Sequence, residues 1–126
     1  MHTKKIVDTD VIIDCLRNYT PAIHYILQIK EKYLMSAITV AELFAGVRNE
    51  QEKTRLQSTL SAFQIIPIDK DIAESGGLLR EKYGKSHGTG IMDALIAATA
   101  LHNEATVVTH NIRHFPMVKT IKPYDK

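Results

Sequence analysis

The sequence contains few of the residues that define disulfide-rich, zinc-binding or membrane proteins. Cys15 is the single cysteine among 126 residues, and there is no tryptophan. One cysteine excludes a disulfide framework and a zinc site made of cysteines. No apolar stretch reaches the length that a membrane-spanning helix needs. We therefore expect a protein of a reducing compartment, in the cytoplasm and with no membrane partner.

The sequence also lacks a strong excess of charge of either sign. It has 16 basic and 14 acidic residues, which gives a formal net charge of +2. A balance this close to zero does not by itself indicate a nucleic-acid-binding protein. It becomes informative only if the acidic residues gather in one place, because the remaining surface is then more basic than the total implies.

The order of apolar and polar segments predicts an α/β fold. Short apolar runs typical of strands lie at residues 5–7, 33–37, 65–68, 106–109 and 119–122. Helical patterns alternate with them, and the last of these, residues 91–101, has almost no polar face and should be buried. Strands that alternate with helices specify a parallel sheet covered on both faces. We expect one domain, residues 1–126, with a three-layer α/β/α fold and a central, mostly parallel sheet of about five strands.

Three local features refine this prediction. Thr9 or Asp10 is predicted to cap the first helix, and Asp71 the fifth. Pro67 removes one hydrogen-bond donor from the third strand, which therefore lies at an edge of the sheet or ends early. The glycine-rich stretch 84–90 is predicted to be a flexible loop between the fifth and sixth helices.

Acids and one amide stand where several of these strands end. Asp8 follows the first strand, Glu42 lies just after the second, and Asn111 lies just after the fourth. Because the carboxyl ends of parallel strands share one edge of a sheet, these side chains should lie close together. Asp93 stands in the first turn of the apolar helix 91–101, where a carboxylate needs a partner.

A hard divalent cation would be a suitable partner for these acids. Mg²⁺ or Mn²⁺ prefers oxygen ligands and is usually held by one or two carboxylates while a substrate phosphate fills other positions. Two such ions about 3.5–4 Å apart can clamp the attacking and leaving oxygens of an in-line phosphoryl displacement. The acids therefore predict metal-assisted hydrolysis of a phosphodiester.

Each acid also has a purely structural interpretation. Asp8 could cap the helix that follows it. Glu42 could be the returning glutamate of a capping box that begins at Thr39. Asp93 could complement the dipole of its helix. The order and placement of the acids together, rather than any one of them, favour the catalytic interpretation.

Four blocks of the sequence resemble those of PIN-domain ribonucleases, and within that group those of VapC-type toxins of toxin–antitoxin pairs. The blocks are residues 6–14, 39–46, 92–100 and 108–115. They occur in the family's order, and the resemblance covers nearly the whole chain. It implies a PIN-like fold, RNA cleavage, homodimers, and silencing by a cognate VapB-type antitoxin whose tail occupies the active-site groove.

The resemblance also implies roles for individual residues. Asp8, Glu42 and Asp93 would be the metal-binding and catalytic acids, with Mg²⁺ or Mn²⁺ as the cofactor. Thr9 and Thr109 would lie beside them as supporting residues. A water activated by the metal would then attack the scissile phosphate.

Two positions depart from the family's pattern. The family often has a fourth acid in the loop where this chain has Asn111. An amide can still ligate a metal through its oxygen or hold a water, but it adds no charge. The number of metal ions, one or two, therefore stays open. Asp10 stands where a neutral polar residue is common in the family, and it could supply part of the missing charge as a further supporting residue.

Basic residues near the predicted site are candidates for contacts to RNA phosphates. They are Lys82, Lys85, His87 and Arg113. A plain solvated surface is the alternative interpretation of this set. His110 and His114 have the spacing of a zinc pair, but no HExxH context accompanies them, so we set zinc aside.

Two other functions remain as alternatives. Asp8-Thr9-Asp10 resembles the Asp-x-Asp signature of haloacid-dehalogenase-type phosphatases, in which the first aspartate is the nucleophile. In this chain Asp93 precedes Thr109, so the order of that family's later motifs fails. A catalytically inactive module that binds RNA or protein is the second alternative.

Overall fold

The computed structural model describes residues 4–126, and its centre is a five-stranded sheet in which every neighbouring pair is parallel. The strands are β1 (Lys4–Val7), β2 (Tyr33–Ser36), β3 (Phe63–Ile66), β4 (Ala105–Val108) and β5 (Thr120–Ile121). Their order in the sheet is β3-β2-β1-β4-β5. The third strand therefore lies at an edge of the sheet and also ends at Ile66, directly before Pro67, so both predicted effects of this proline occur. Because all pairs are parallel, the carboxyl ends of the strands meet at one edge.

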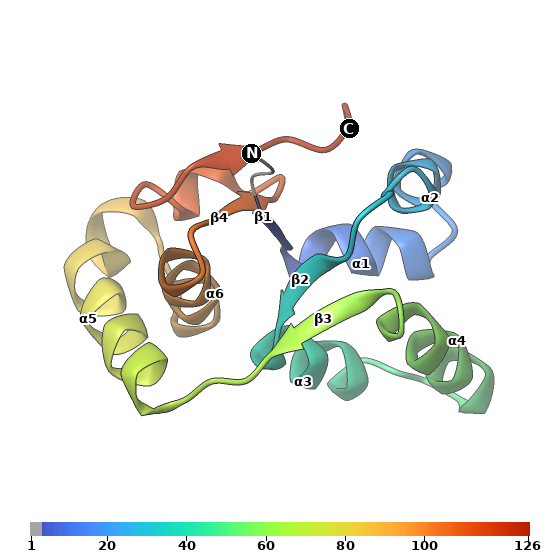
Figure 1. The fold of residues 1–126 in the computed structure, drawn as a ribbon, viewed down its shortest axis with the longest axis horizontal. Coiled ribbons are helices and arrows are strands. Elements are labelled where there is room, and N and C mark those ends of the chain that lie inside the picture. Colours follow the sequence, from blue (N-terminus) through green and yellow to red (C-terminus); the bar gives the residue numbers. More distant parts are fainter. Residues whose placement is uncertain (1–3) are drawn as a thin grey trace.

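Helices cover both faces of this sheet (Figure 1). They are α1 (Thr9–Leu16), α2 (Thr20–Leu27), α3 (Ala37–Ala45), α4 (Glu50–Leu60), α5 (Lys70–His87) and α6 (Ile91–His102). Helices α5 and α6 lie on one side of β1, and α1, α2 and α4 lie on the other (Figure 1). A short 3-10 helix, η1 (Ile112–His114), follows β4. The predicted three-layer α/β/α fold is confirmed.

Side chains that alternate along the central strand divide the interior into two cores. In β1, Ile6 packs with Leu34 and Val107 against α6, whereas Val7 packs with Val11 and other residues of α1, α3 and α4. Both β1 side chains are fully buried. This pattern is typical of a parallel sheet that is covered on both faces. The second half of β1 is therefore fully buried, so the residue that follows Val7 begins inside the protein.

Helix α5 corrects the predicted loop. The helix continues through Gly84 and ends only at Gly88, which has a left-handed φ of 66°. A left-handed residue is a common helix terminator, and glycine adopts it at little cost. Asp69, rather than Asp71, caps α5 by accepting a hydrogen bond from the Ile72 N–H. The stretch 84–90 is thus mostly helical rather than a flexible loop.

The described residues leave out the start of the chain and include no candidate membrane-spanning helix. Residues 1–3, which the expected domain includes, lie outside the described residues. Within residues 4–126, none of the helices combines the length and the apolar character that crossing a membrane requires.

We predict that two adjacent glycines of α5 respond oppositely to the same substitution. A Cβ on Gly76 would lie 3.3 Å from the Leu95 Cα of α6, whereas a Cβ on Gly77 would meet no atom within 4 Å. Gly76→Val should therefore be less stable than Gly77→Val by about 1–3 kcal/mol, because only the first forces α5 away from α6. Both substitutions change helix propensity equally. Chemical denaturation of the two variants measures the difference, and equal stabilities would contradict the packing of α5 on α6.

Candidate active site

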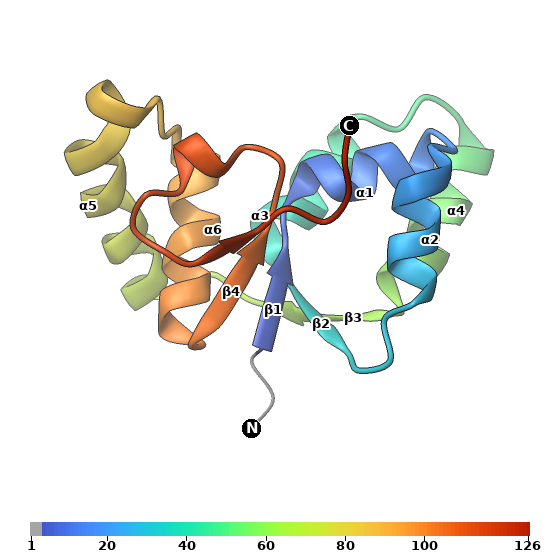
Figure 2. The ribbon, with the colours of Figure 1, turned by 90° about the horizontal axis from the view of Figure 1, so that it is seen from above.

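The candidate site begins where β1 ends and α1 starts, at the carboxyl edge of the sheet (Figure 2). The backbone N–H of Asp8 donates to the Val108 carbonyl at 2.9 Å, so the ladder with β4 extends one residue beyond the strand. The Asp8 side chain is only 3% exposed. A carboxyl group is therefore buried at the end of the central strand.

Two hydrogen bonds hold the Asp8 carboxyl. Its Oδ1 accepts from the backbone N–H of Thr9 at 2.7 Å, and its Oδ2 accepts from the Thr109 hydroxyl at 2.7 Å. Asp8 is thus the residue that caps α1, in place of the predicted Thr9 or Asp10. One oxygen of Asp8 caps α1, and the other binds Thr109 directly after β4. Asp8 can therefore be both a helix cap and a residue of the site.

Glu42 reaches the same place through the hydroxyl of Thr9. Thr9 Oγ1 donates to Glu42 Oε1 at 2.8 Å and lies 3.1 Å from the hydroxyl of the buried Thr39. The N-cap of α3 is Ser36, whose hydroxyl accepts from the Ile38 N–H. The interpretation of Thr39 and Glu42 as a capping box is therefore wrong. Glu42 instead accepts a hydrogen bond at the N-terminus of α1.

Asp93 lies in the first turn of α6 and contacts a histidine that the sequence left unassigned. His114 Nδ1 of η1 lies 3.0 Å from Asp93 Oδ2. The two side chains are 36% and 23% exposed, respectively. His110, which has the spacing of a zinc pair with His114, makes different contacts.

Asp10 is held by the same segment after β4. Its Oδ2 accepts from the backbone N–H of His110 at 3.0 Å. The His110 ring packs on Tyr124, with ring centroids 4.5 Å apart. The Tyr124 hydroxyl donates to Asp14 Oδ2 at 2.8 Å, which fastens the C-terminal segment to α1 (Figure 2). Asn111 is exposed, and its backbone N–H donates to the Thr109 hydroxyl at 2.9 Å.

Burial and repulsion between neighbouring acids dominate the electrostatics of Asp8. Burial is the main reason that the pKa of Asp8 rises to about 7, and the negative charge of Asp10 is the next largest cause. The Asp93 carboxylate raises the pKa of Asp8 in the same direction. Burial also raises the pKa of Asp10. Three of the predicted acidic and supporting residues therefore interact, although they lie on two different helices and one strand end.

A divalent cation fits the chemistry of these residues. Among the residues that the structure describes, no three His, Cys, Asp or Glu side chains are grouped closely enough to hold a metal ion. The donors are nevertheless oxygens of the kind that Mg²⁺ and Mn²⁺ prefer. Asp10 Oδ1 is buried without a hydrogen bond of good geometry, and Asp8 is buried among like charges. A positive charge at this edge would relieve both.

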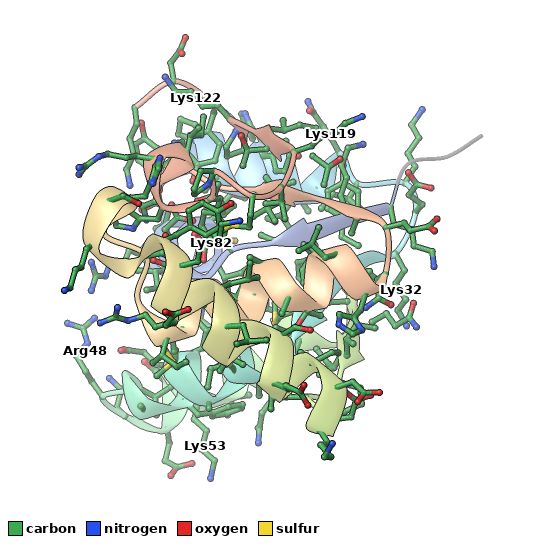
Figure 3. The ribbon with its side chains drawn as sticks, turned by 90° about the vertical axis from the view of Figure 1, so that its left-hand side faces the viewer. Lys32, Arg48, Lys53, Lys82, Lys119 and Lys122 are labelled. Atoms are coloured by element: carbon green, nitrogen blue, oxygen red, sulfur yellow. The ribbon has the colours of Figure 1, made fainter. Side chains whose placement is uncertain are left out.

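The predicted phosphate contacts lie on the last turns of α5 and on η1. Lys82 and Lys85 are exposed on α5, and Lys82 Nζ lies 5.3 Å from the centre of the Tyr83 ring. His87 bonds to Ser86 near the end of the same helix. Arg113 is exposed on η1, between Asn111 and His114. Basic side chains labelled in Figure 3 are spread around the molecule, which agrees with the small net charge.

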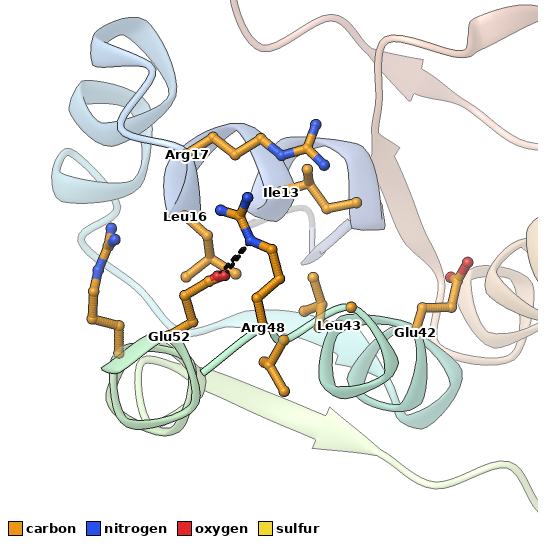
Figure 4. A pocket seen from close by; sticks show the side chains of 10 residues that line it. Ile13, Leu16, Arg17, Glu42, Leu43, Arg48 and Glu52 are labelled. Atoms are coloured by element: carbon orange, nitrogen blue, oxygen red, sulfur yellow. Dashed lines mark hydrogen bonds and ion pairs between the residues drawn. The ribbon is translucent and has the colours of Figure 1, made fainter. Parts of the chain in front are cut away.

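A cavity of about 160 Å³ extends from Glu42 between α1, α3 and α4. Its apolar lining is Ile13, Leu16, Leu43 and Val47, and its charged lining includes Arg17, Arg48, Glu52 and Arg55. Glu42 lies at one end, and the Arg48–Glu52 ion pair, with a distance of 2.8 Å, lies toward the other (Figure 4). The cavity therefore connects an apolar surface with a basic rim to the acidic edge of the sheet.

Sequence reasoning missed His114, Thr39 and the arginines of this cavity as parts of the site. The spacing of Thr39 and Glu42 places both on one face of α3, which is the signal that could have found Thr39. His114 follows Asn111 by three residues, but nothing in that spacing indicates its contact with Asp93 on another helix.

Comparisons with known proteins give a consistent result. Residues 5–119 match the family model described as the PIN domain. Ribonuclease VapC19 of Mycobacterium tuberculosis is 37% identical over 123 residues, which cover 94% of this chain and 98% of that protein. A toxin–antitoxin complex from Klebsiella pneumoniae superimposes with a TM-score of 0.82 at 27% identity, covering 98% of this chain and all of that one. FitAcB from Neisseria gonorrhoeae gives a TM-score of 0.75 at 33% identity, covering 94% and 97%.

We predict that Asp8→Asn stabilises the metal-free protein at pH 8. The folded-state pKa of Asp8, about 7, lies above the ordinary value of 3.8, so the folded state holds a proton that the unfolded state has lost between these values. Stability therefore falls as the pH rises from about 4 to about 7. Asparagine removes this cost, and the gain at pH 8 should be on the order of 2 kcal/mol. Urea unfolding in EDTA at pH 4 and pH 8 measures it, and the gain should nearly vanish at pH 4.

Asp14→Asn is the matched control for this prediction. Burial alone would raise the pKa of Asp14, but hydrogen bonds from Lys126 and Tyr124 outweigh it and lower the pKa. A lowered pKa contributes stability that is present above the unfolded-state pKa and is lost as the pH falls. Asp14→Asn should therefore be less stable than the wild type at pH 8, opposite in sign to Asp8→Asn. If both substitutions changed the free energy of unfolding at pH 8 in the same direction, the destabilising burial of the Asp8 carboxylate would be contradicted.

Proposed function

The chain belongs to the PIN domain family, and on that premise we propose that it is a metal-dependent endoribonuclease, the toxin of a toxin–antitoxin pair. Curated relatives that carry the name ribonuclease, at 37% identity, support the RNA-cleaving activity. The observation that carries the proposal is the buried Asp8 carboxyl, whose pKa rises to about 7 beside Asp10 and Asp93. Perturbed acids of this kind are characteristic of catalytic sites.

Asp8, Glu42 and Asp93 would hold the Mg²⁺ or Mn²⁺ ion. When bound, such an ion lowers the pKa of a water molecule and stabilises negative charge on a phosphate. Asp10 adds a further negative charge to the same edge, and Asn111 offers an amide oxygen in place of a fourth acid. The number of ions, one or two, follows from whether Asp10 and Asn111 act as ligands.

The chain's own residues orient these acids. The Thr9 N–H and the Thr109 hydroxyl each donate to one oxygen of Asp8, and the Thr9 hydroxyl donates to Oε1 of Glu42, so these donors fix the orientation of both acids. In hydrolysis, a water oxygen bonds to phosphorus, the bond from phosphorus to the ribose oxygen breaks, and that oxygen takes up a proton. By holding the cation at a fixed place, the acids would determine where the phosphate binds and so favour this in-line exchange.

Basic residues around the edge would contact the RNA backbone. Lys82, Lys85 and His87 come from the last turns of α5, and Arg113 comes from η1. Phosphate contacts of this kind supply affinity without sequence preference and weaken as the salt concentration rises. An enzyme that cuts cellular RNA would act in the cytoplasm.

We also propose that the cavity between α1, α3 and α4 takes part of the cognate antitoxin. Solved structures similar to this chain are toxin–antitoxin complexes, which supports a partner of that kind. An apolar floor of Leu16, Leu43 and Val47 suits one face of an amphipathic segment, and Arg17 and Arg55 in the same lining suit acidic residues beside it. A segment bound here would end beside Glu42. Homodimers are the expected assembly of the free protein.

We predict that the antitoxin-free protein cleaves total RNA into discrete fragments with Mg²⁺ or Mn²⁺ and does not cleave it with EDTA. Asp8→Asn and Asp93→Asn should each lower the cleavage rate by at least about 100-fold, because each removes a metal-binding charge. Asp71→Asn, which alters an exposed acid of the first turn of α5, should cleave like the wild type. Gel electrophoresis of the products, with circular dichroism to verify folding, makes the measurement.

Each alternative function has its own outcome in this experiment. A phosphatase of the haloacid-dehalogenase type would release phosphate from small phosphoesters and accumulate a phosphoryl group on Asp8. An inactive module would bind RNA or an antitoxin and leave the RNA intact with every metal. Either result would refute the ribonuclease.

A further inference from the structure

His114 is joined to the start of α6 by both its side chain and its backbone. Its Nδ1 lies 3.0 Å from Asp93 Oδ2, and its carbonyl accepts from the Thr89 hydroxyl at 2.8 Å. Thr89 is 1% exposed, so this second bond is buried. One residue of η1 thus holds both the segment that leads into α6 and the acid in the first turn of α6.

The N-terminus of α6 has no side-chain cap. Gly90 is its N-cap and makes no side-chain capping hydrogen bond. A Cβ on Gly88 would lie 3.5 Å from His114 Nε2, which shows that the imidazole is seated against the turn between α5 and α6. The position of Asp93 therefore depends on His114 more than on a cap of its own helix.

The hydrogen bond to His114 makes the two carboxylate oxygens of Asp93 unequal, because only one of them accepts it. A carboxylate only accepts hydrogen bonds, so the hydrogen between the two groups lies on Nδ1 of the imidazole. Oδ2 is engaged by that hydrogen, which leaves Oδ1 as the oxygen without this bond. Partners that bind a ligating carboxylate in this way fix its orientation and change metal affinity by about 10- to 100-fold when they are removed.

We propose that His114 is a positioning residue that holds Asp93 through Oδ2 so that Oδ1 alone is presented to the divalent cation. This proposal rests on the proposed metal-dependent function. It assigns His114 no contact with substrate. It gives a role to a residue for which the sequence alone assigned none.

Two amide substitutions test the hydrogen bond itself. Asparagine places its amide N–H₂ close to the position of Nδ1, whereas glutamine places it near the position of Nε2. His114→Asn should therefore keep the bond to Asp93, and His114→Gln and His114→Ala should lose it. His102→Ala is the matched control, because His102 also bonds to a side chain, Ser75, but at the far end of α6.

The measurement is Mn²⁺ affinity by isothermal titration calorimetry on the whole protein in the absence of RNA. We expect His114→Gln and His114→Ala to bind Mn²⁺ at least about 10-fold more weakly, with His114→Asn within about threefold of the wild type. His102→Ala should be unchanged. Thermal unfolding without metal verifies that each variant folds, and the Asn–Gln pair retains the test if the alanine variant does not.

The outcomes separate this proposal from the proposed function. Wild-type affinity in the Gln variant, or equal weakening in the Asn and Gln variants, would overturn the positioning role while the wild type still binds Mn²⁺ and cleaves RNA. A wild-type protein that neither binds Mn²⁺ nor cleaves RNA would overturn the metal-dependent function, and the role of His114 with it.

Discussion

The structure depends on a carboxyl group that is buried at the end of its central strand. β1 lies between β2 and β4, and its last two side chains enter the two cores, so Asp8 directly follows a buried stretch and is itself buried. Burying a carboxylate is costly unless donors or an opposing charge compensate it. Here the Thr9 N–H and the Thr109 hydroxyl supply donors, and neighbouring acids add repulsion instead of relief. The fold is thus arranged around a charge that it does not itself neutralise.

The segment that follows β4 organises most of the acids. Thr109 binds Asp8, the His110 N–H binds Asp10, and His114 binds Asp93. This segment carries no acid between residues 105 and 124, so it contributes donors and no further negative charge. Its own position is secured by β5 on one side and by the packing of Tyr124 on His110 on the other. The C-terminal residues therefore belong to the support of the site.

Asp8, Asp10 and Asp93 interact at this edge of the sheet. The basic side chains labelled in Figure 3 come from helices and from the segments between elements, so they are dispersed over the molecule. A cation bound by these acids could in turn bind a phosphate of a polyanion, and the dispersed basic residues could contact its other phosphates. The arginines beside the cavity add positive charge close to Glu42, where a bound partner would meet it.

The sequence by itself determined the alternation of strands and helices and the parallel sheet, because these follow from periodicity. It also placed Asp8 at the carboxyl edge of that sheet, because the ends of parallel strands share one edge. That Glu42 and Asp93 act there together with Asp8 stays a prediction. The sequence did not determine the end of α5, where Gly84 continues the helix and Gly88 ends it, since either glycine suits a turn. Only the tertiary structure decided which donors hold the acids. The bonds of Thr109 to Asp8 and of His114 to Asp93 join residues 101 and 21 positions apart, and no local pattern encodes a contact between side chains that meet only after the sheet and α6 have packed.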